Sequence, residues 1–157
     1  MRKDVLSWDQ YFMGMAHLSA MRSKDPNTRV GACIVNPQKR VVGLGYNGFP
    51  YGCEDEEFPW DRDGEFLETK YPYVVHAELN AILNSIQDLH GCTLYVSLFP
   101  CNECVKAIIQ SGIKEIVYED NKYEGKDFDL AAKKMLQAAN VKTRQFKDDR
   151  LKIEVCQ

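Results

Sequence analysis

The sequence contains no apolar run that approaches the roughly eighteen residues needed to cross a bilayer. Its first residues, Met1 to Asp4, lead into an amphipathic segment, whereas a secretory signal would continue into an apolar h-region. Internal repeats and low-complexity tracts are also missing. We therefore expect a soluble cytoplasmic protein with no membrane partner, and we expect residues 1–157 to form a single domain.

Neither sign of charge predominates, since 20 basic residues stand against 23 acidic ones and the net charge is −3. A field of this kind offers no general attraction to a polyanion, so a nucleic acid partner is disfavoured. Without a secretory signal, the six cysteines are better interpreted as thiols or metal ligands than as a disulfide framework. We expect Cys33, Cys92 and Cys156 to be ordinary buried thiols.

The first part of the chain predicts a helix followed by a β-hairpin. Ser7 suits the helix N-cap because Gln10 follows three residues later. The apolar stripe of this helix, which we expect in the core, consists of Trp8, Tyr11, Phe12, Met15 and Leu18. Two β-rich runs at 30–35 and 41–46 predict an antiparallel pair. Prolines, an Asn-Gly pair and an acidic run at 54–57 then predict a long irregular loop over 47–72, of a length that is usually functional or mobile.

Helices and strands alternate in the remainder of the chain. The patterns predict helices at 76–86, 100–110 and 128–139, strands at 92–97, 113–118 and 141–146, and a short edge strand at 151–155. This alternation is typical of an α/β sheet with parallel crossovers and helices on both faces.

Two short motifs, His76-Ala77-Glu78 and Pro100-Cys101-Asn102-Glu103-Cys104, each open a predicted helix. Both helix starts can point to one end of the sheet. We assign Pro100 to the first helical position, where its missing N–H is not needed, and the spacing of Cys101 and Cys104 puts both sulfurs on one helical face. The positive end of the helix dipole favours the thiolates that zinc binds. With His76 there are three protein ligands, which leaves a fourth tetrahedral position for water and indicates catalysis.

Glu78 follows His76 by two residues, which is roughly 200° around a regular helix. The two side chains can therefore approach one ion only from the first turn, with His76 binding from the cap. Zinc lowers the pKa of a bound water toward ~7 and makes hydroxide available at neutral pH. We expect Glu78 to move protons at this water and not to bind the metal.

The combination of H-x-E with P-C-x-x-C about twenty-five residues later is much more specific than either motif alone. It is the signature of zinc-dependent nucleobase deaminases. For a cytosine, Glu78 would protonate N3, hydroxide would attack C4, and Glu78 would then protonate the departing amine. The alternative is a structural zinc in a non-enzymatic interaction domain, which would need a fourth protein ligand such as Cys92 or His90.

The run Gly43-Leu44-Gly45-Tyr46-Asn47-Gly48 matches the dinucleotide-binding pattern G-x-G-x-x-G. That pattern has to lead directly into a helix whose N-terminus receives the pyrophosphate. Here Phe49-Pro50-Tyr51-Gly52 follows, with no helical stripe. We therefore reject a dinucleotide site.

Several stretches resemble the deoxycytidylate deaminase family of eukaryotes and viruses. They are Arg22–Asn27, Val30–Val35, Gly45–Gly48, Thr69–Val74, His76–Ala81 and Phe99–Cys104, and the likeness runs from about Ser7 to Tyr123. It implies the cytidine-deaminase fold, a five-stranded mixed sheet flanked by helices in three layers. It also implies one catalytic Zn²⁺ per chain, hydrolysis of dCMP to dUMP and ammonia in support of thymidylate synthesis, and a homohexamer.

The resemblance also implies roles for particular residues. Asn47 would contact the sugar, Ala77 the base through its backbone, and Asn27 and Tyr123 the phosphate side. Many members respond to dCTP and dTTP at a second site between subunits, and this implies that Gly45, Tyr46, Gly48 and Gly52 lie near an effector, whose triphosphate would carry Mg²⁺.

Taken from the residues alone, other interpretations stay open. Asn47 and Gly48 equally suit a turn that serves only backbone geometry. Lys24, Arg29 and Lys122 are candidate phosphate partners or solvated surface groups. The substrate could also be cytidine, guanine, or a base in tRNA or single-stranded DNA, although the acidic run and the net negative charge disfavour a polynucleotide.

Overall fold

The computed structural model describes residues 1–148 and 150–156 and is built on one five-stranded sheet. The strands are β1 (Gly31–Val35), β2 (Val41–Tyr46), β3 (Thr93–Leu98), β4 (Glu115–Asp120) and β5 (Lys142–Gln145), in the order β2-β1-β3-β4-β5. β1 pairs antiparallel with β2 and β3, whereas β3, β4 and β5 run parallel. The hairpin and the parallel crossovers predicted from the sequence are confirmed.

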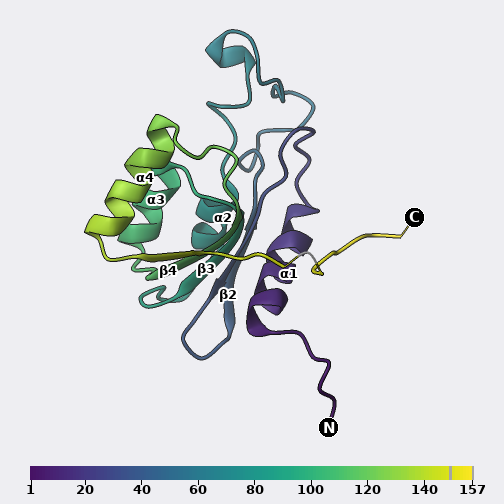
Figure 1. The fold of residues 1–157 in the computed structure, drawn as a ribbon. Helices are drawn as coiled ribbons and strands as arrows, with labels where there is room; N and C mark the ends of the chain where they lie inside the picture. Colours follow the sequence, from purple (N-terminus) through teal and green to yellow (C-terminus); the bar gives the residue numbers. More distant parts are fainter. Residues whose placement is uncertain (149, 157) are drawn as a thin grey trace.

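Helices cover both faces of the sheet, in three layers (Figure 1). They are α1 (Trp8–Ala20), α2 (Ala77–Asn84), α3 (Asn102–Gln110) and α4 (Asp127–Ala138), with a 3-10 turn η1 (Phe66–Glu68). α1 lies on one face, and the other three lie on the opposite face. Side chains alternate along each strand, so Ile34 belongs to the core under α2 and α3, whereas Cys33 packs toward α1.

The capping box predicted for α1 is present. Ser7 Oγ accepts a hydrogen bond from the Gln10 N–H at 3.1 Å, and Gln10 Oε1 accepts one from the Ser7 N–H at 2.8 Å. The predicted core stripe is partly wrong, because Trp8 and Leu18 are 54% and 53% exposed. Tyr11 is also exposed and Met15 is half-buried. Phe12 is buried as predicted, and the helix packs through it together with Met13 and Ala16, of which Ala16 lies against Gly31 of the sheet.

Three smaller predictions are also wrong. Residues 151–155 form no strand, although Leu151 packs against the core beside α1. Segment 47–72 is not wholly irregular, since it contains η1. Cys156 is exposed, whereas Cys33 and Cys92 are buried as expected.

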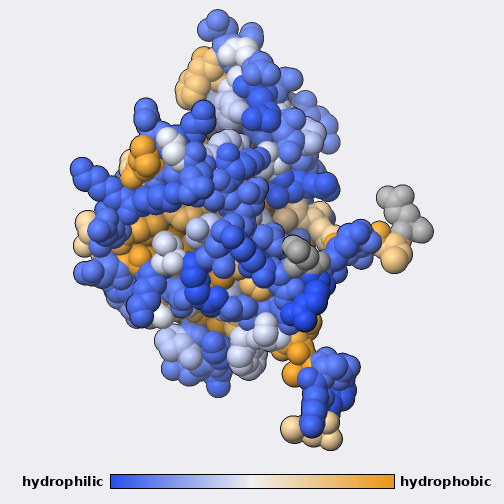
Figure 2. All heavy atoms as spheres, in the orientation of Figure 1, coloured by the Kyte–Doolittle hydropathy of each residue, from blue (hydrophilic) through white to orange (hydrophobic). Residues whose placement is uncertain are grey.

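On the face drawn in Figure 2 hydrophilic residues predominate and apolar ones form scattered patches. Among the described residues, none of the helices has the length and apolarity that a membrane crossing requires.

Two glycines let α2 lie directly on β2. A Cβ atom at Gly45 would stand 2.3 Å from both the Ala77 carbonyl oxygen and the Ala81 nitrogen, and one at Gly43 would stand 2.6 Å from the Ala81 oxygen. Asn80 Nδ2 also donates to the Tyr46 carbonyl oxygen at 2.8 Å. β2 continues as a strand through these glycines, so the rejection of a dinucleotide site is consistent with the fold.

We expect Gly45→Ala to destabilise the protein by about 3 kcal/mol, because the new methyl group meets helix backbone that cannot rotate away. The measurement is the free energy of unfolding in urea. Gly48→Ala is the matched control: a Cβ there meets nothing within 4 Å, and its unfolding midpoint should stay near that of the parent. Equal midpoints for the two variants would contradict this account of α2 packing.

Candidate metal centre and adjoining cavity

His76, Cys101 and Cys104 meet at one end of the sheet. His76 is the N-cap of α2, Cys101 is the N-cap of α3, and Cys104 lies in the first turn of α3. The bridge between Gly48 and Val75 holds the chain just before His76, beside the end of β2. The predicted convergence of two helix starts is therefore confirmed. Pro100 was misplaced, because it precedes the N-cap and is not the first helical residue.

The spacing of the three ligand atoms suits a zinc ion. His76 Nδ1 lies 3.5 Å from Cys101 Sγ and 3.4 Å from Cys104 Sγ, and all three atoms lie within 4.8 Å of one another. Tetrahedral zinc with ordinary Zn–N and Zn–S bonds would hold such atoms about 3.5 Å apart. One nitrogen and two sulfurs are also the donor types that zinc prefers.

Burial and hydrogen bonding shift the ionisation of these groups. The Cys104 thiol and His76 lower the pKa of Cys101 to about 4, so Cys101 is held as a thiolate. The hydrogen bond with Cys101 raises the pKa of His76 to about 9. Glu78 is only 4% exposed, and burial raises the pKa of its carboxyl group, partly opposed by His76. Burial therefore favours the protonated form of the Glu78 carboxyl group relative to an exposed glutamate.

The residues considered as a fourth protein ligand lie elsewhere. His90 and Cys92 precede β3, whereas Cys101 follows the other end of that strand. Neither belongs to the cluster formed by His76, Cys101 and Cys104 within residues 1–148 and 150–156. The four-ligand structural site is therefore not formed by the described part of the chain.

A cavity of about 500 Å³ adjoins the cluster. His76, Glu78 and Cys101 line it, so the three-ligand cluster borders the cavity. Its apolar wall consists of Val30, Val74, Ala77, Leu98 and Phe99. This volume and this mixture of apolar surface with a few polar groups are typical of a small-molecule site.

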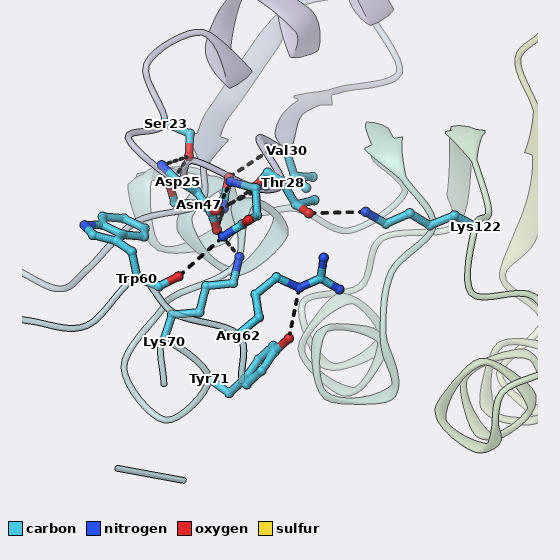
Figure 3. Close-up of polar contacts among 11 residues, drawn as sticks. Ser23, Asp25, Thr28, Val30, Asn47, Trp60, Arg62, Lys70, Tyr71 and Lys122 are labelled. Atoms are coloured by element: carbon cyan, nitrogen blue, oxygen red, sulfur yellow. Dashed lines mark hydrogen bonds and ion pairs between the residues drawn. The ribbon is translucent and has the colours of Figure 1, made fainter. Parts of the chain in front are cut away.

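Asn47 lies on the cavity wall with its amide group fully oriented (Figure 3). Its Oδ1 accepts from the Val30 N–H at 2.8 Å, and its Nδ2 donates to the Thr28 carbonyl oxygen at 2.9 Å. Nδ2 also donates to Asp25 Oδ2 at 3.2 Å. A backbone N–H can only donate and a backbone carbonyl can only accept, so these partners fix which end of the amide is oxygen.

Cations and aromatic rings surround the outer part of the cavity. Arg62 Nε donates to the Tyr71 hydroxyl at 3.4 Å, and Lys122 Nζ donates to Thr28 Oγ1 at 3.2 Å. Lys122 also lies 5.0 Å from the centre of the Tyr123 ring. In Figure 3 the Arg62 and Lys122 side chains reach toward each other from opposite sides, which concentrates positive charge at this part of the site.

The remaining residues with a phosphate or effector role predicted from the sequence do not line the main cavity. Asn27 lines a separate small polar hollow with Arg62. Lys24 is paired with Asp55 on the surface, and Arg29 is exposed. Of the four predicted effector residues, Gly45 packs against α2, Tyr46 lies under the Arg22 guanidinium, Gly48 bridges to Val75, and Gly52 is in an exposed turn with φ of +82°.

Sequence reasoning gave no site role to Asp25, Arg62, Lys70, Tyr71 and Phe128, all of which line the cavity. Four of them lie in irregular segments, where periodicity carries no information about direction. The available signal was the length of segment 47–72 and the charged residues within it, which indicate function without indicating which side chain turns inward.

The comparisons with known proteins agree with this geometry. Residues 6–120 match the family model for the cytidine and deoxycytidylate deaminase zinc-binding region. The chain is 56% identical over 147 residues to deoxycytidylate deaminase of Homo sapiens, covering 92% of this chain and 83% of that protein. It is 54% identical over 151 residues to a probable deoxycytidylate deaminase of Drosophila melanogaster, covering 92% of this chain and 74% of that protein.

A crystal structure of dCMP deaminase from the cyanophage S-TIM5, in complex with dCMP and dUMP, has a similar fold. The TM-score is 0.69 at 27% sequence identity, and the match covers 93% of this chain and 99% of the phage chain. The likeness in fold therefore extends over nearly the whole chain.

We expect the protein to bind one zinc ion per chain and Cys104→Ser to lose nearly all of it, because the serine hydroxyl is a much poorer zinc ligand than a thiolate. Metal analysis after dialysis measures the zinc content. Cys156→Ser removes an exposed thiol outside the cluster and should keep the full zinc content. Zinc retained by Cys104→Ser would contradict this assignment of the ligands.

Proposed function

The chain belongs to the cytidine and deoxycytidylate deaminase family, and from this premise we propose that it hydrolyses dCMP to dUMP and ammonia. The observation that carries the proposal is the open three-ligand cluster of His76, Cys101 and Cys104, with the buried Glu78 beside it at the end of a nucleotide-sized cavity. The human relative, similar over nearly the whole chain, is named for this activity.

His76, Cys101 and Cys104 are the proposed zinc ligands. Zinc, when bound, supplies an activated water as the nucleophile. The chain itself supplies the orientation of the base, because the apolar wall that includes Val30 and Phe99 excludes water around the ring. The backbone of Ala77, which lines the cavity between His76 and Glu78, is placed to contact an edge of the base.

Glu78 is the proposed proton carrier. Its carboxyl group is buried and its pKa is raised, so it can accept a proton from the nucleophilic water and hold it without solvent exchange. It donates this proton to N3 of the base, then takes up the second proton of the attacking oxygen and delivers it to the departing amine. The balance is one water consumed and one ammonia released for each dCMP.

Asn47 suits a sugar contact in which it accepts a hydrogen bond and does not donate one. Both of its N–H groups are used by Asp25 and Thr28, so only the second lone pair of Oδ1 remains for a ligand. A remaining acceptor selects a donor, and the 3′-hydroxyl is the one donor on deoxyribose. We assign the phosphate to the part of the cavity lined by Arg62 and Tyr123, with Lys122 beside Tyr123 and Asn27 in the separate hollow that Arg62 also lines.

Rival substrates of the same chemistry are less well matched. Cytidine and free bases make no use of the cations at the outer cavity. A polynucleotide needs a basic channel, whereas the net charge here is −3 and Glu54 to Glu57 form an acidic run. The non-enzymatic zinc domain lacks a fourth ligand within the described residues and leaves the buried Glu78 without a purpose.

Glu78→Gln should keep zinc and fold but lose dCMP turnover by a factor on the order of 10³ or more, because the amide cannot carry the proton. Turnover is followed by the absorbance change from dCMP to dUMP, with zinc content measured on the same samples. The control is Glu103→Gln in α3, which removes an exposed carboxylate that pairs with Lys106 on the surface and should keep the parental turnover.

Comparison of substrates tests the identity of the nucleotide. dCMP should be deaminated faster than deoxycytidine at equal low concentration, and a single-stranded oligonucleotide should not react. Parental turnover in Glu78→Gln would contradict the mechanism, whereas equal rates for dCMP and deoxycytidine would contradict only the phosphate assignment.

We also propose the assembly and control that the family resemblance implies. Val41, Leu44 and Tyr46 are exposed apolar side chains on the edge strand β2, and this supports a homo-oligomer, with a hexamer as the expected form. A cytoplasmic location and a single domain over residues 1–157 belong to the same proposal. The segment with Gly45, Tyr46, Gly48 and Gly52 would contact a dCTP or dTTP effector carrying Mg²⁺.

We expect dCTP to raise and dTTP to lower the turnover of dCMP at subsaturating substrate. The assay measures initial rates with each triphosphate in the presence and absence of Mg²⁺, and sizing by light scattering is done on the same samples. Rates that do not change with either triphosphate would contradict the regulatory proposal and leave the deamination chemistry untouched.

A further inference from the structure

A buried ion pair lies at the side of the cavity where Asn47 is held. The Lys70 ammonium donates to Asp25 Oδ2, and the two side chains are only 9% and 1% exposed. Asp25 Oδ1 accepts from the Asn27 N–H at 2.8 Å and the Thr28 N–H at 3.1 Å. Because an unpaired buried charge is costly, Lys70 stabilises this carboxylate as its cationic partner.

The same carboxylate oxygen also accepts from Asn47. Asp25 Oδ2 receives Asn47 Nδ2 at 3.2 Å together with the Lys70 ammonium, so the amide and the ammonium converge on one atom (Figure 3). Without the ammonium, the Asp25 carboxylate would be a buried charge with no cationic partner, and the oxygen that accepts from Asn47 would no longer be held in place. Lys70 therefore secures the orientation that leaves Asn47 Oδ1 as an acceptor.

Among the described residues, the Lys70 ammonium has fewer hydrogen-bond acceptors around it than N–H donors. An ammonium group carries three N–H donors, and the hydrogen bonds of the described residues supply one acceptor, on Asp25. Lys70, Asp25 and Asn47 all line the cavity. A ligand group next to this trio meets a free acceptor on Asn47 and a free donor on Lys70. A hydroxyl group, which donates once and accepts as well, matches both.

Lys70 also connects the parts of the site through its backbone. Its N–H donates to the Asp61 carbonyl oxygen at 2.9 Å, next to Arg62, and its carbonyl oxygen accepts from the Val74 N–H at 2.9 Å, two residues before His76. The ammonium is therefore held at a fixed place relative to both the outer cavity and the metal cluster.

We propose that Lys70 determines specificity for a nucleotide with a 3′-hydroxyl group, acting with Asn47 as a donor and acceptor pair joined by Asp25. This inference rests on the proposed function and deepens it. The 3′-hydroxyl donates to Asn47 Oδ1 and accepts from the Lys70 ammonium. A site built around such a pair discriminates against a ligand without the hydroxyl, because buried polar groups are then left unpaired.

The test compares dCMP with 2′,3′-dideoxycytidine monophosphate, which lacks only the 3′-hydroxyl. We expect the parent enzyme to prefer dCMP by about 100-fold in kcat/KM, and Lys70→Met to reduce this preference to about threefold. A loss of stability alone would lower the rates of both substrates together and leave their ratio unchanged. Zinc content and the unfolding midpoint are measured on each variant.

Lys70→Met leaves Asp25 as a buried charge without a partner, so a second variant protects the test against misfolding. Asp25→Asn combined with Lys70→Met removes both charges, and it should show the same loss of preference for dCMP. Lys134→Met, on the exposed surface of α4, is the matched control and should keep the parental ratio.

Three results would overturn the inference. One is a parent enzyme that deaminates both nucleotides equally well, and another is a folded, zinc-loaded Lys70 variant that keeps the parental ratio. The third is a Lys70 variant that keeps the parental preference for dCMP over the dideoxy nucleotide but loses the preference for dCMP over deoxycytidine. That result would assign Lys70 to the phosphate. A parent enzyme without any activity on dCMP would instead refute the proposed function.

Discussion

The site depends on the meeting of two helix starts at one end of the sheet. α3 begins directly after β3, so Cys101 and Cys104 are placed by the strand that precedes them. His76 has no such support and reaches the same point only because α2 lies on the glycines of β2 and the Gly48–Val75 bridge holds its entry. The distances of 3.4 and 3.5 Å between His76 Nδ1 and the two sulfurs follow from that packing.

A second constraint organises the rest of the cavity. Asp25 is a buried carboxylate that accepts hydrogen bonds from two backbone N–H groups, the Asn47 amide and the Lys70 ammonium. All of these groups donate to the carboxylate, and each donor is held in one orientation as a result. Polar groups that are already ordered lose less entropy when a ligand binds, which is the advantage of building one wall of a pocket in this way.

The metal cluster could be predicted from the sequence because its spacing is local. Cys101 and Cys104 share one helix start, and the two-residue step from His76 to Glu78 makes sense only in a first turn, where the structure places them. Lys70 could not be predicted in the same way. It lies in segment 47–72, where no periodicity relates a residue to a face, and its role depends on Asp25, forty-five positions away. The stripe of α1 was only partly correct for a related reason, since the contact of Ala16 with Gly31 joins segments that no helical period relates.

By itself, the sequence determined the α/β class, the hairpin, the capped first helix and the three candidate metal ligands with Glu78 beside them, because each depends on chemistry within a few positions of the chain. Only the tertiary structure decided that the cluster borders a cavity, that Asn47 presents an acceptor, and that Lys70 and Arg62 turn inward from an irregular segment. These features arise from contacts between segments distant in the sequence, and the energy of such contacts is set by packing and by the pairing of buried polar groups, which no local pattern records.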